Sequence, residues 1–118
     1  MEKTGAVTAL AALAQDSRLD AYRLLVQAGP DGMPAGEVAA KLGLPPNTLT
    51  FHFDRLRQAG LVTVRRNGRS MIYAARYDTM NALLAYLTDN CCGGTRDLCA
   101  PASCNPSEPA QRAKETTS

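Results

Sequence analysis

The chain has 118 residues, of which 45% are apolar and 20% charged, and its formal net charge is only +2. This length and composition predict one folded domain and exclude a collagen-like or fully disordered chain. They also exclude a membrane protein, because no apolar run approaches the roughly 18 residues that a membrane-spanning helix needs. Aromatic residues are too few, at 5%, for a platform on which nucleic-acid bases stack.

Two helices are predicted near the amino terminus. Residues 4–14 are rich in alanine and leucine, which favour helix. A second helix, capped by Asp16 or Ser17, carries apolar residues at helical spacing and is predicted to end near Gly29.

Two further helices follow, joined by a short break. Residues 35–42 are predicted to be helical, and Gly43 supplies the stop signal. After two prolines, Asn47 is expected to cap a helix over residues 48–59. This arrangement predicts a helix-turn-helix.

The apolar period then changes from that of a helix to that of a strand. Residues 61–65 and 71–75 alternate, and the Asn67-Gly68 pair between them is a strong hairpin signal. A fifth helix is expected after Tyr77-Asp78, running to about Asn90. The order α-α-α-α-β-β-α predicts a mainly α fold with a small β-hairpin, a winged helix-turn-helix domain over residues 1–90.

Positive charge is concentrated in residues 50–76, where six arginines face one carboxylate, Asp54, for a net charge of +5. The remaining residues carry seven cations and ten carboxylates, a net charge of −3. Such a basic segment is the footprint expected for contact with DNA phosphates. Since a recognition helix lays its exposed face into the major groove and the hairpin reaches flanking phosphates, the predicted DNA-binding residues come from both elements. They are Asn47, Thr48, Thr50, Phe51, Arg55, Gln58, Arg65, Arg66, Asn67 and Arg69.

The inward face of this helix is predicted to hold Leu49, Phe53 and Leu56, which fall together at 100° per residue. His52, the only histidine, lies at the edge of that stripe. A partly buried, hydrogen-bonded histidine is therefore expected rather than a metal ligand or a general base. No catalytic triad, phosphate-binding loop or carboxylate pair stands out, so the sequence argues against an enzyme.

Two motifs resemble the ArsR/SmtB family of metal-responsive transcriptional repressors. The segment 12–19, Ala-Leu-Ala-Gln-Asp-Ser-Arg-Leu, resembles the opening motif of that family, and residues 50–62 resemble its recognition-helix signature. The wing residues Arg66-Asn67-Gly68-Arg69 and Tyr73 also match. The resemblance covers about residues 5–90 and implies a homodimer that binds a partly palindromic operator in double-stranded DNA. The cysteines, which are clustered and absent from the first 90 residues, favour the cytoplasm, where thiols stay reduced.

The dimer implied by this resemblance is built on the first and last helices. The apolar residues expected at its interface are Leu10, Leu13, Met80, Leu83, Leu84 and Leu87.

Two inducer sites known in the family are not expected here. The segment 34–36 has no cysteine where some members bind arsenic, and the last helix has no histidine where others bind zinc. Instead, the segment 90–97, Asn-Cys-Cys-Gly-Gly-Thr-Arg-Asp, resembles members that bind arsenite with cysteines just after the last helix. The third cysteine, Cys99, comes one residue later than in those members.

All four cysteines lie in residues 91–104, predicted to be an inducer-binding segment before a disordered tail, 105–118. Trivalent arsenic or antimony takes three soft thiolates, which Cys91, Cys92 and Cys99 can supply, with Cys104 as a spare. Zinc would prefer four ligands at a different spacing.

The sequence thus predicts an arsenite-responsive repressor, in which As(III) or Sb(III) at the three-cysteine site releases the dimer from its operator. Two alternatives stay open. The thiols could form a redox switch or sense another thiophilic metal. The chain could also be a metalloid-carrying thiol protein that does not bind DNA, although such a carrier would not need the basic hairpin.

Overall fold

The computed structural model describes residues 1–89, and residues 1–87 form one compact unit. The inducer segment 91–104, its four cysteines and the tail 105–118 lie outside the described residues, so those predictions stay predictions. The helices are α1 (Lys3–Leu13), α2 (Asp16–Ala28), α3 (Ala35–Leu42), α4 (Pro46–Gln58) and α5 (Tyr77–Leu87). The strands are β1 (Met33–Pro34), β2 (Val62–Asn67) and β3 (Ser70–Ala75).

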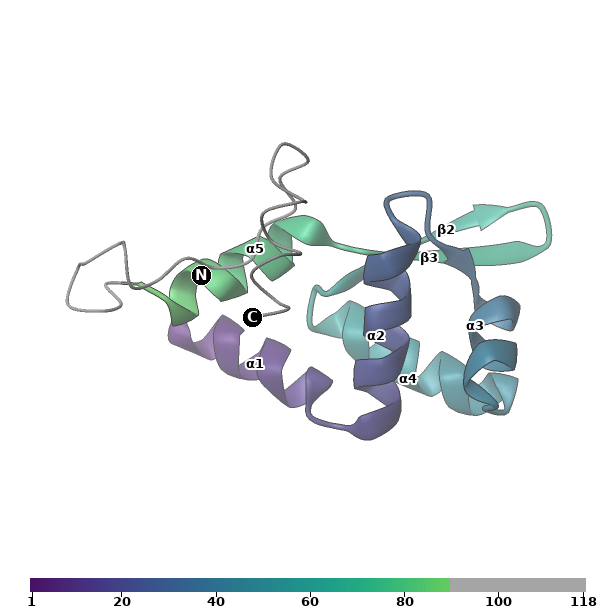
Figure 1. Ribbon diagram of the computed structural model, residues 1–118, viewed down its shortest axis with the longest axis horizontal. Coiled ribbons are helices and arrows are strands. Elements are labelled where there is room, and N and C mark those ends of the chain that lie inside the picture. The colour runs from purple at the N-terminus through teal and green to yellow at the C-terminus, as the bar shows by residue number, and fades with distance from the viewer. Residues whose placement is uncertain (90–118) are drawn as a thin grey trace, which may run out of the picture. The chain divides into compact units, whose positions relative to one another are not determined.

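The elements of this unit are arranged as a winged helix-turn-helix, which confirms the predicted fold class. Helices α1 and α5 lie beside each other at one end, and the β2–β3 hairpin projects at the opposite end (Figure 1). Helices α2, α3 and α4 pack together between them. None of the described helices is long and apolar enough to cross a membrane.

The core forms where α4 meets the other elements. Leu49, Phe53 and Leu56 are at most 1% exposed, as their helical spacing predicts. Each such side chain contributes on the order of 1.5–3 kcal/mol when it leaves water. The Phe53 ring also stacks on Tyr73 of β3, with centroids 4.1 Å apart, so the core joins the recognition helix to the wing.

The wing is also attached to α4 through the backbone. The amide of Leu61 donates to the carbonyl of Leu56 at 2.9 Å, and the amide of Arg76 donates to the carbonyl of Leu61 at 2.8 Å. Both ends of the hairpin are therefore fixed to the end of the recognition helix.

Strand β1 was not expected from the sequence, and it makes the sheet three-stranded, in the order β1-β3-β2. Met33 pairs with Tyr73 and Pro34 with Ile72. A strand of two residues is too short to show alternation. Gly32, just before it, has φ +78°, and a side chain there would meet the backbone carbonyl of Tyr73.

Three predicted helix ends are wrong. Helix α2 already includes Asp16, and its N-cap is Gln15, whose side chain accepts from the amide of Arg18 at 2.9 Å. Helix α4 begins at Pro46, because proline needs no amide partner in the first turn, so Asn47 lies inside the helix and does not cap it. Helix α5 begins at Tyr77 and ends at Leu87, short of Asn90.

Candidate nucleic-acid interface

The turn between α3 and α4 places α4 across the core with one face outward. Helix α3 ends at Gly43, which has φ +67° and donates its amide to the carbonyls of Ala39 and Ala40. Pro45 then serves as the N-cap of α4 and Pro46 occupies the first helical position. The predicted stop at Gly43 is confirmed, and the two prolines set where the recognition helix starts.

The outward face of α4 carries most of the predicted base-reading side chains. The exposed ones are Asn47, Thr50, Phe51, Arg55 and Gln58, whereas Thr48 is half-buried. Phe51 is 52% exposed, which is unusual for a large apolar ring in a folded domain. Its position on the helix surface suits an apolar contact within a DNA groove.

Asp54 neutralises one arginine of this helix and leaves another available. Its carboxylate pairs with Arg57 at 2.7 Å and accepts from the amide nitrogen of Gln58 at 2.9 Å. Arg55 instead lies over the Phe51 ring, 5.1 Å from its centroid, and has no ion pair within residues 1–89. The outward face therefore presents one guanidinium that a phosphate or a base edge can accept.

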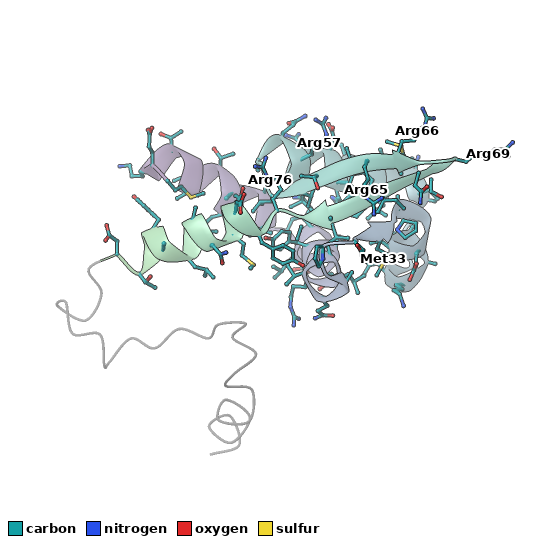
Figure 2. The ribbon with its side chains drawn as sticks, turned by 90° about the horizontal axis from the view of Figure 1, so that it is seen from above. Met33, Arg57, Arg65, Arg66, Arg69 and Arg76 are labelled. Carbon is teal, nitrogen blue, oxygen red and sulfur yellow. The ribbon has the colours of Figure 1, made fainter. Side chains whose placement is uncertain are left out.

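The wing presents further arginines near its tip. Arg66 and Arg69 are exposed and extend into solvent, Arg69 at the very end of the hairpin (Figure 2). Asn67 pairs with Ser70 in the strand register, so the turn consists of Gly68 and Arg69. Neither Arg66 nor Arg69 has a carboxylate partner among the residues that the structure describes.

Arg65 differs from the other predicted wing contacts. Adjacent strand residues point to opposite faces, and Arg65 projects away from Arg66 (Figure 2). Its Nη2 donates to the backbone carbonyl of Asp31 at 2.7 Å. This hydrogen bond holds the wing against the loop before β1, so Arg65 already has a structural partner.

His52 belongs to the buried face of the recognition helix α4 and is only 8% exposed. Arg18 Nη1 lies 3.4 Å from its Nδ1, and Arg18 Nε donates to the carbonyl of Ala12 at 2.6 Å. Burial, with a smaller effect of the Arg18 charge, lowers the pKa of His52 below 6.5. The predicted role as a buried, hydrogen-bonded histidine is confirmed.

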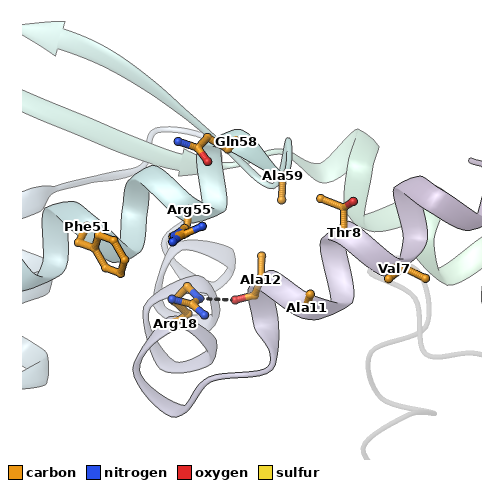
Figure 3. A pocket seen from close by; sticks show the side chains of 9 residues that line it. All are labelled: Val7, Thr8, Ala11, Ala12, Arg18, Phe51, Arg55, Gln58 and Ala59. Atoms are coloured by element: carbon orange, nitrogen blue, oxygen red, sulfur yellow. Dashed lines mark hydrogen bonds between the residues drawn. The ribbon is translucent and has the colours of Figure 1, made fainter.

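Arg18 is the important side chain that the sequence-based site did not include. It joins the end of α1 to α4 and lines a pocket with Arg55 (Figure 3). Its only signal in the sequence was its place in the motif that covers residues 12–19.

The residues predicted at the dimer interface differ in exposure. Leu10, Leu84 and Leu87 are 42%, 47% and 54% exposed, whereas Leu13 and Met80 are half-buried. Leu83 is 6% exposed and belongs to the core of the protomer. No group of three or more metal-ligating side chains occurs within residues 1–89.

Comparison with known proteins identifies the same architecture. A family model described as a helix-turn-helix domain matches residues 13–65. The chain is 36% identical over 73 residues to the uncharacterized HTH-type transcriptional regulator YceK of Bacillus subtilis (strain 168), a match that covers 62% of this chain and 72% of YceK.

Two solved structures extend this result. HlyU from Vibrio cholerae N16961 is 30% identical, with a TM-score of 0.60, over 74% of this chain and 97% of HlyU. Mb0332 from Mycobacterium bovis, a homodimeric winged helix-turn-helix DNA-binding domain described as a possible ArsR-family regulator, is 26% identical, with a TM-score of 0.60, over 74% of this chain and 81% of that domain. The chain belongs to the HTH-type transcriptional regulators, and it is similar to a regulator described as a possible member of the ArsR family.

Proposed function

We propose that the chain is a homodimeric, arsenite-responsive repressor that binds operator DNA through α4 and the wing. The observation that carries the DNA-binding part is the pair Arg66 and Arg69, which are exposed on the wing without carboxylate partners within residues 1–89. Arg55 and Phe51 add a cationic and an apolar contact on the outward face of α4. Together they fit a helix in the major groove and a hairpin on the flanking phosphates.

Dimerisation through α1 and α5 is supported by the apolar residues that these helices expose. Leu10, Leu84 and Leu87 are 42%, 47% and 54% exposed. The homodimeric state of the related Mb0332 domain supports the same assembly. A dimer presents two recognition helices, which suits an operator with two similar half-sites.

The inducer in this proposal is As(III) or Sb(III), bound by Cys91, Cys92 and Cys99. These thiols follow α5 closely in the sequence. Metalloid binding beside a dimer helix changes the angle between the two DNA-binding units and weakens their simultaneous fit to the operator. The coupling between the two ligands is expected to be on the order of 1–3 kcal/mol.

The test is a fluorescence-anisotropy titration of fully reduced protein with the DNA upstream of its own gene, with and without arsenite. We expect arsenite to weaken binding of the wild-type chain by about 5- to 150-fold, the range of that coupling. Cys91→Ser and Cys92→Ser should keep the operator affinity but lose the response, whereas Cys104→Ser should keep both. Equal affinity with and without arsenite would refute the proposed inducer.

A thiol redox switch is distinguished by the same titration. In that case diamide, which oxidises vicinal thiols, would weaken DNA binding, whereas arsenite added under reducing conditions would not. A metalloid carrier that does not bind DNA is disfavoured because the chain belongs to a family of helix-turn-helix regulators.

A further inference from the structure

A pocket lies between α1, the start of α2 and the outward face of α4 (Figure 3). Its volume is about 660 Å³. Small-molecule sites in proteins commonly have volumes of roughly 300–1,000 Å³. The pocket is therefore large enough for an organic ligand of moderate size.

Two arginines line this pocket, and no acidic residue does. Arg18 reaches it from α2 and Arg55 from α4, and both guanidinium groups face the same space (Figure 3). Neither has an ion pair with any carboxylate of residues 1–89. Two like charges that share a concave surface repel each other, so an anion placed between them is stabilised by both.

The hydrogen bonds of Arg18 fix its position and leave it able to bind a ligand. Nε is held by the carbonyl of Ala12 and Nη1 by the ring of His52. Burial, and then the Arg18 charge, lowers the pKa of His52, and the neutral ring that this favours can accept the hydrogen bond from Arg18 at Nδ1. The other terminal nitrogen, Nη2, has no hydrogen-bond partner among the described residues.

The rest of the lining is largely apolar. Val7 and Ala11 of α1 form one side, and the exposed ring of Phe51 forms another (Figure 3). An inorganic anion has no apolar surface to bury against these side chains. An anion with a flat or branched apolar body would fill them and gain the burial free energy of its own carbon surface.

We propose that this pocket binds an organic carboxylate with an aromatic or bulky apolar body. The carboxylate lies between Arg18 and Arg55, and the apolar body packs against Phe51, Val7 and Ala11. Leu10, which belongs to the proposed dimer interface, is not part of this lining, so dimerisation need not close the pocket.

A ligand bound in the pocket would contact side chains that are also proposed to contact DNA. Phe51, Arg55 and Gln58 line the pocket and also form the outward face of α4. A carboxylate ligand therefore competes with DNA for Arg55. This second step rests on the proposed function, and it gives the regulator an input that is separate from its cysteines.

The experiment uses the full-length chain and 2-naphthoate as the probe. Isothermal titration calorimetry at constant ionic strength compares it with 2-naphthamide, which lacks the charge, with acetate, which lacks the ring system, and with inorganic phosphate. We expect 2-naphthoate to bind at least tenfold more tightly than each of the three. Equal binding of 2-naphthamide would show a purely apolar cleft, and equal binding of phosphate a plain anion site; either result overturns the proposal.

Matched variants on α4 locate the site. Arg55→Gln should weaken 2-naphthoate binding about tenfold, whereas Arg57→Gln, an exposed arginine of the same helix outside the pocket, should stay within about twofold. The ring resonances of His52, which contacts Arg18, should shift on addition of 2-naphthoate in wild type. Equal loss of affinity in both variants would indicate general charge attraction and overturn the assigned site.

A DNA titration separates this inference from the proposed function. With operator DNA, 2-naphthoate should raise the apparent Kd by the factor one plus the ratio of its concentration to its own dissociation constant, and acetate at the same ionic strength should not. If 2-naphthoate binds but leaves the DNA affinity unchanged, its regulatory role is wrong while the site stands. If the chain binds no DNA, the proposed function fails, and the calorimetry still decides whether the site exists.

Discussion

His52 and Arg18 are two buried or half-buried polar residues that connect three helices. Arg18 on α2 donates to a carbonyl of α1 and contacts the ring of His52 on α4. Both residues are thus satisfied by each other and by backbone, as buried polar groups generally are. The start of α2 therefore fixes the recognition helix against α1.

The titration of His52 tests this arrangement. Burial and then the Arg18 charge hold its pKa below 6.5, and an NMR titration can follow it without ambiguity because the chain has no other histidine. Arg18→Gln should raise the pKa towards 6.5, since the positive charge is removed. A pKa at or above 6.5 in the wild-type chain would contradict the described contacts.

The same shift predicts how stability depends on pH. The unfolded chain binds a proton on His52 at a higher pH than the folded chain does, so the contribution of His52 to stability is present above pH 6.5. It disappears as the pH falls from 6.5 through the folded pKa. Urea titrations should show this decrease for wild type and a smaller one for His52→Gln; equal pH profiles would argue against it.

Gly32 occupies a position where only glycine fits without strain. Its φ of +78° and the nearby carbonyl of Tyr73 leave no room for a side chain. Gly32→Ala should lower the free energy of unfolding by about 2 kcal/mol, from backbone strain and the displaced β1. Gly36→Ala, where nothing lies within 4 Å, is the control and should leave the urea midpoint unchanged or raised.

At the scale of elements, the wing divides its arginines between two tasks. Arg65 holds the hairpin to the loop before β1, while Arg66 and Arg69 extend into solvent. Alternation along β2 separates Arg65 from Arg66, because neighbouring residues point to opposite faces, whereas Arg69 lies in the turn. The basic patch is therefore smaller than its count of arginines suggests.

The salt dependence of DNA binding should reveal this division. Arg66→Ala or Arg69→Ala should lower the slope of log K against log salt by about 1 for each phosphate that the variant no longer neutralises. Arg65→Ala should leave the slope unchanged and instead reduce thermal stability. Measurement by anisotropy between low and moderate salt checks both; an unchanged slope in all three variants would exclude the wing from the interface.

Local sequence signals predicted most elements but not the contacts between them. The bounds of α3 and the inward residues of α4 follow from spacing and from glycine. The Asn67-Gly68 signal predicted the hairpin, although its turn consists of Gly68 and Arg69. Strand β1 was not predicted because its two residues are too few to show an alternation of apolar and polar side chains. Its pairing also depends on β3, which is far away in the chain.

The pocket was not predicted either, because it too depends on contacts between elements that are distant in the sequence. Its walls come from α1, α2 and α4, and no short motif contains them. Arg18 acquires its role only when α1 and α4 lie beside it. The cysteine segment is known from the sequence alone, and its proposed chemistry depends on the titration with arsenite.

At the scale of the whole molecule, the proposed dimer rests on the outer surfaces of α1 and α5. Leu10 and Leu87 are 42% and 54% exposed although they lie on helices that pack together. Leaving such apolar surface in water is unfavourable, and a second copy of the chain can cover it.

Placing charge on this surface tests the dimer. Leu10→Glu and Leu87→Glu should shift the chain towards monomer in sedimentation equilibrium, because association would bury an unpaired carboxylate. Leu19→Glu on α2, where the leucine is similarly exposed at 43%, is the control and should remain dimeric. A dimer that persists in the first two variants would place the interface elsewhere.

The stacking of Phe53 on Tyr73 has a consequence for any form of regulation. It joins the recognition helix and the hairpin into one rigid body, and the hydrogen bonds around Leu61 fix both ends of the hairpin to the end of the helix. An inducer that reorients this body cannot strip the wing from the phosphates while the helix stays seated in its groove. Contacts to bases and contacts to the phosphate backbone are therefore expected to be lost together.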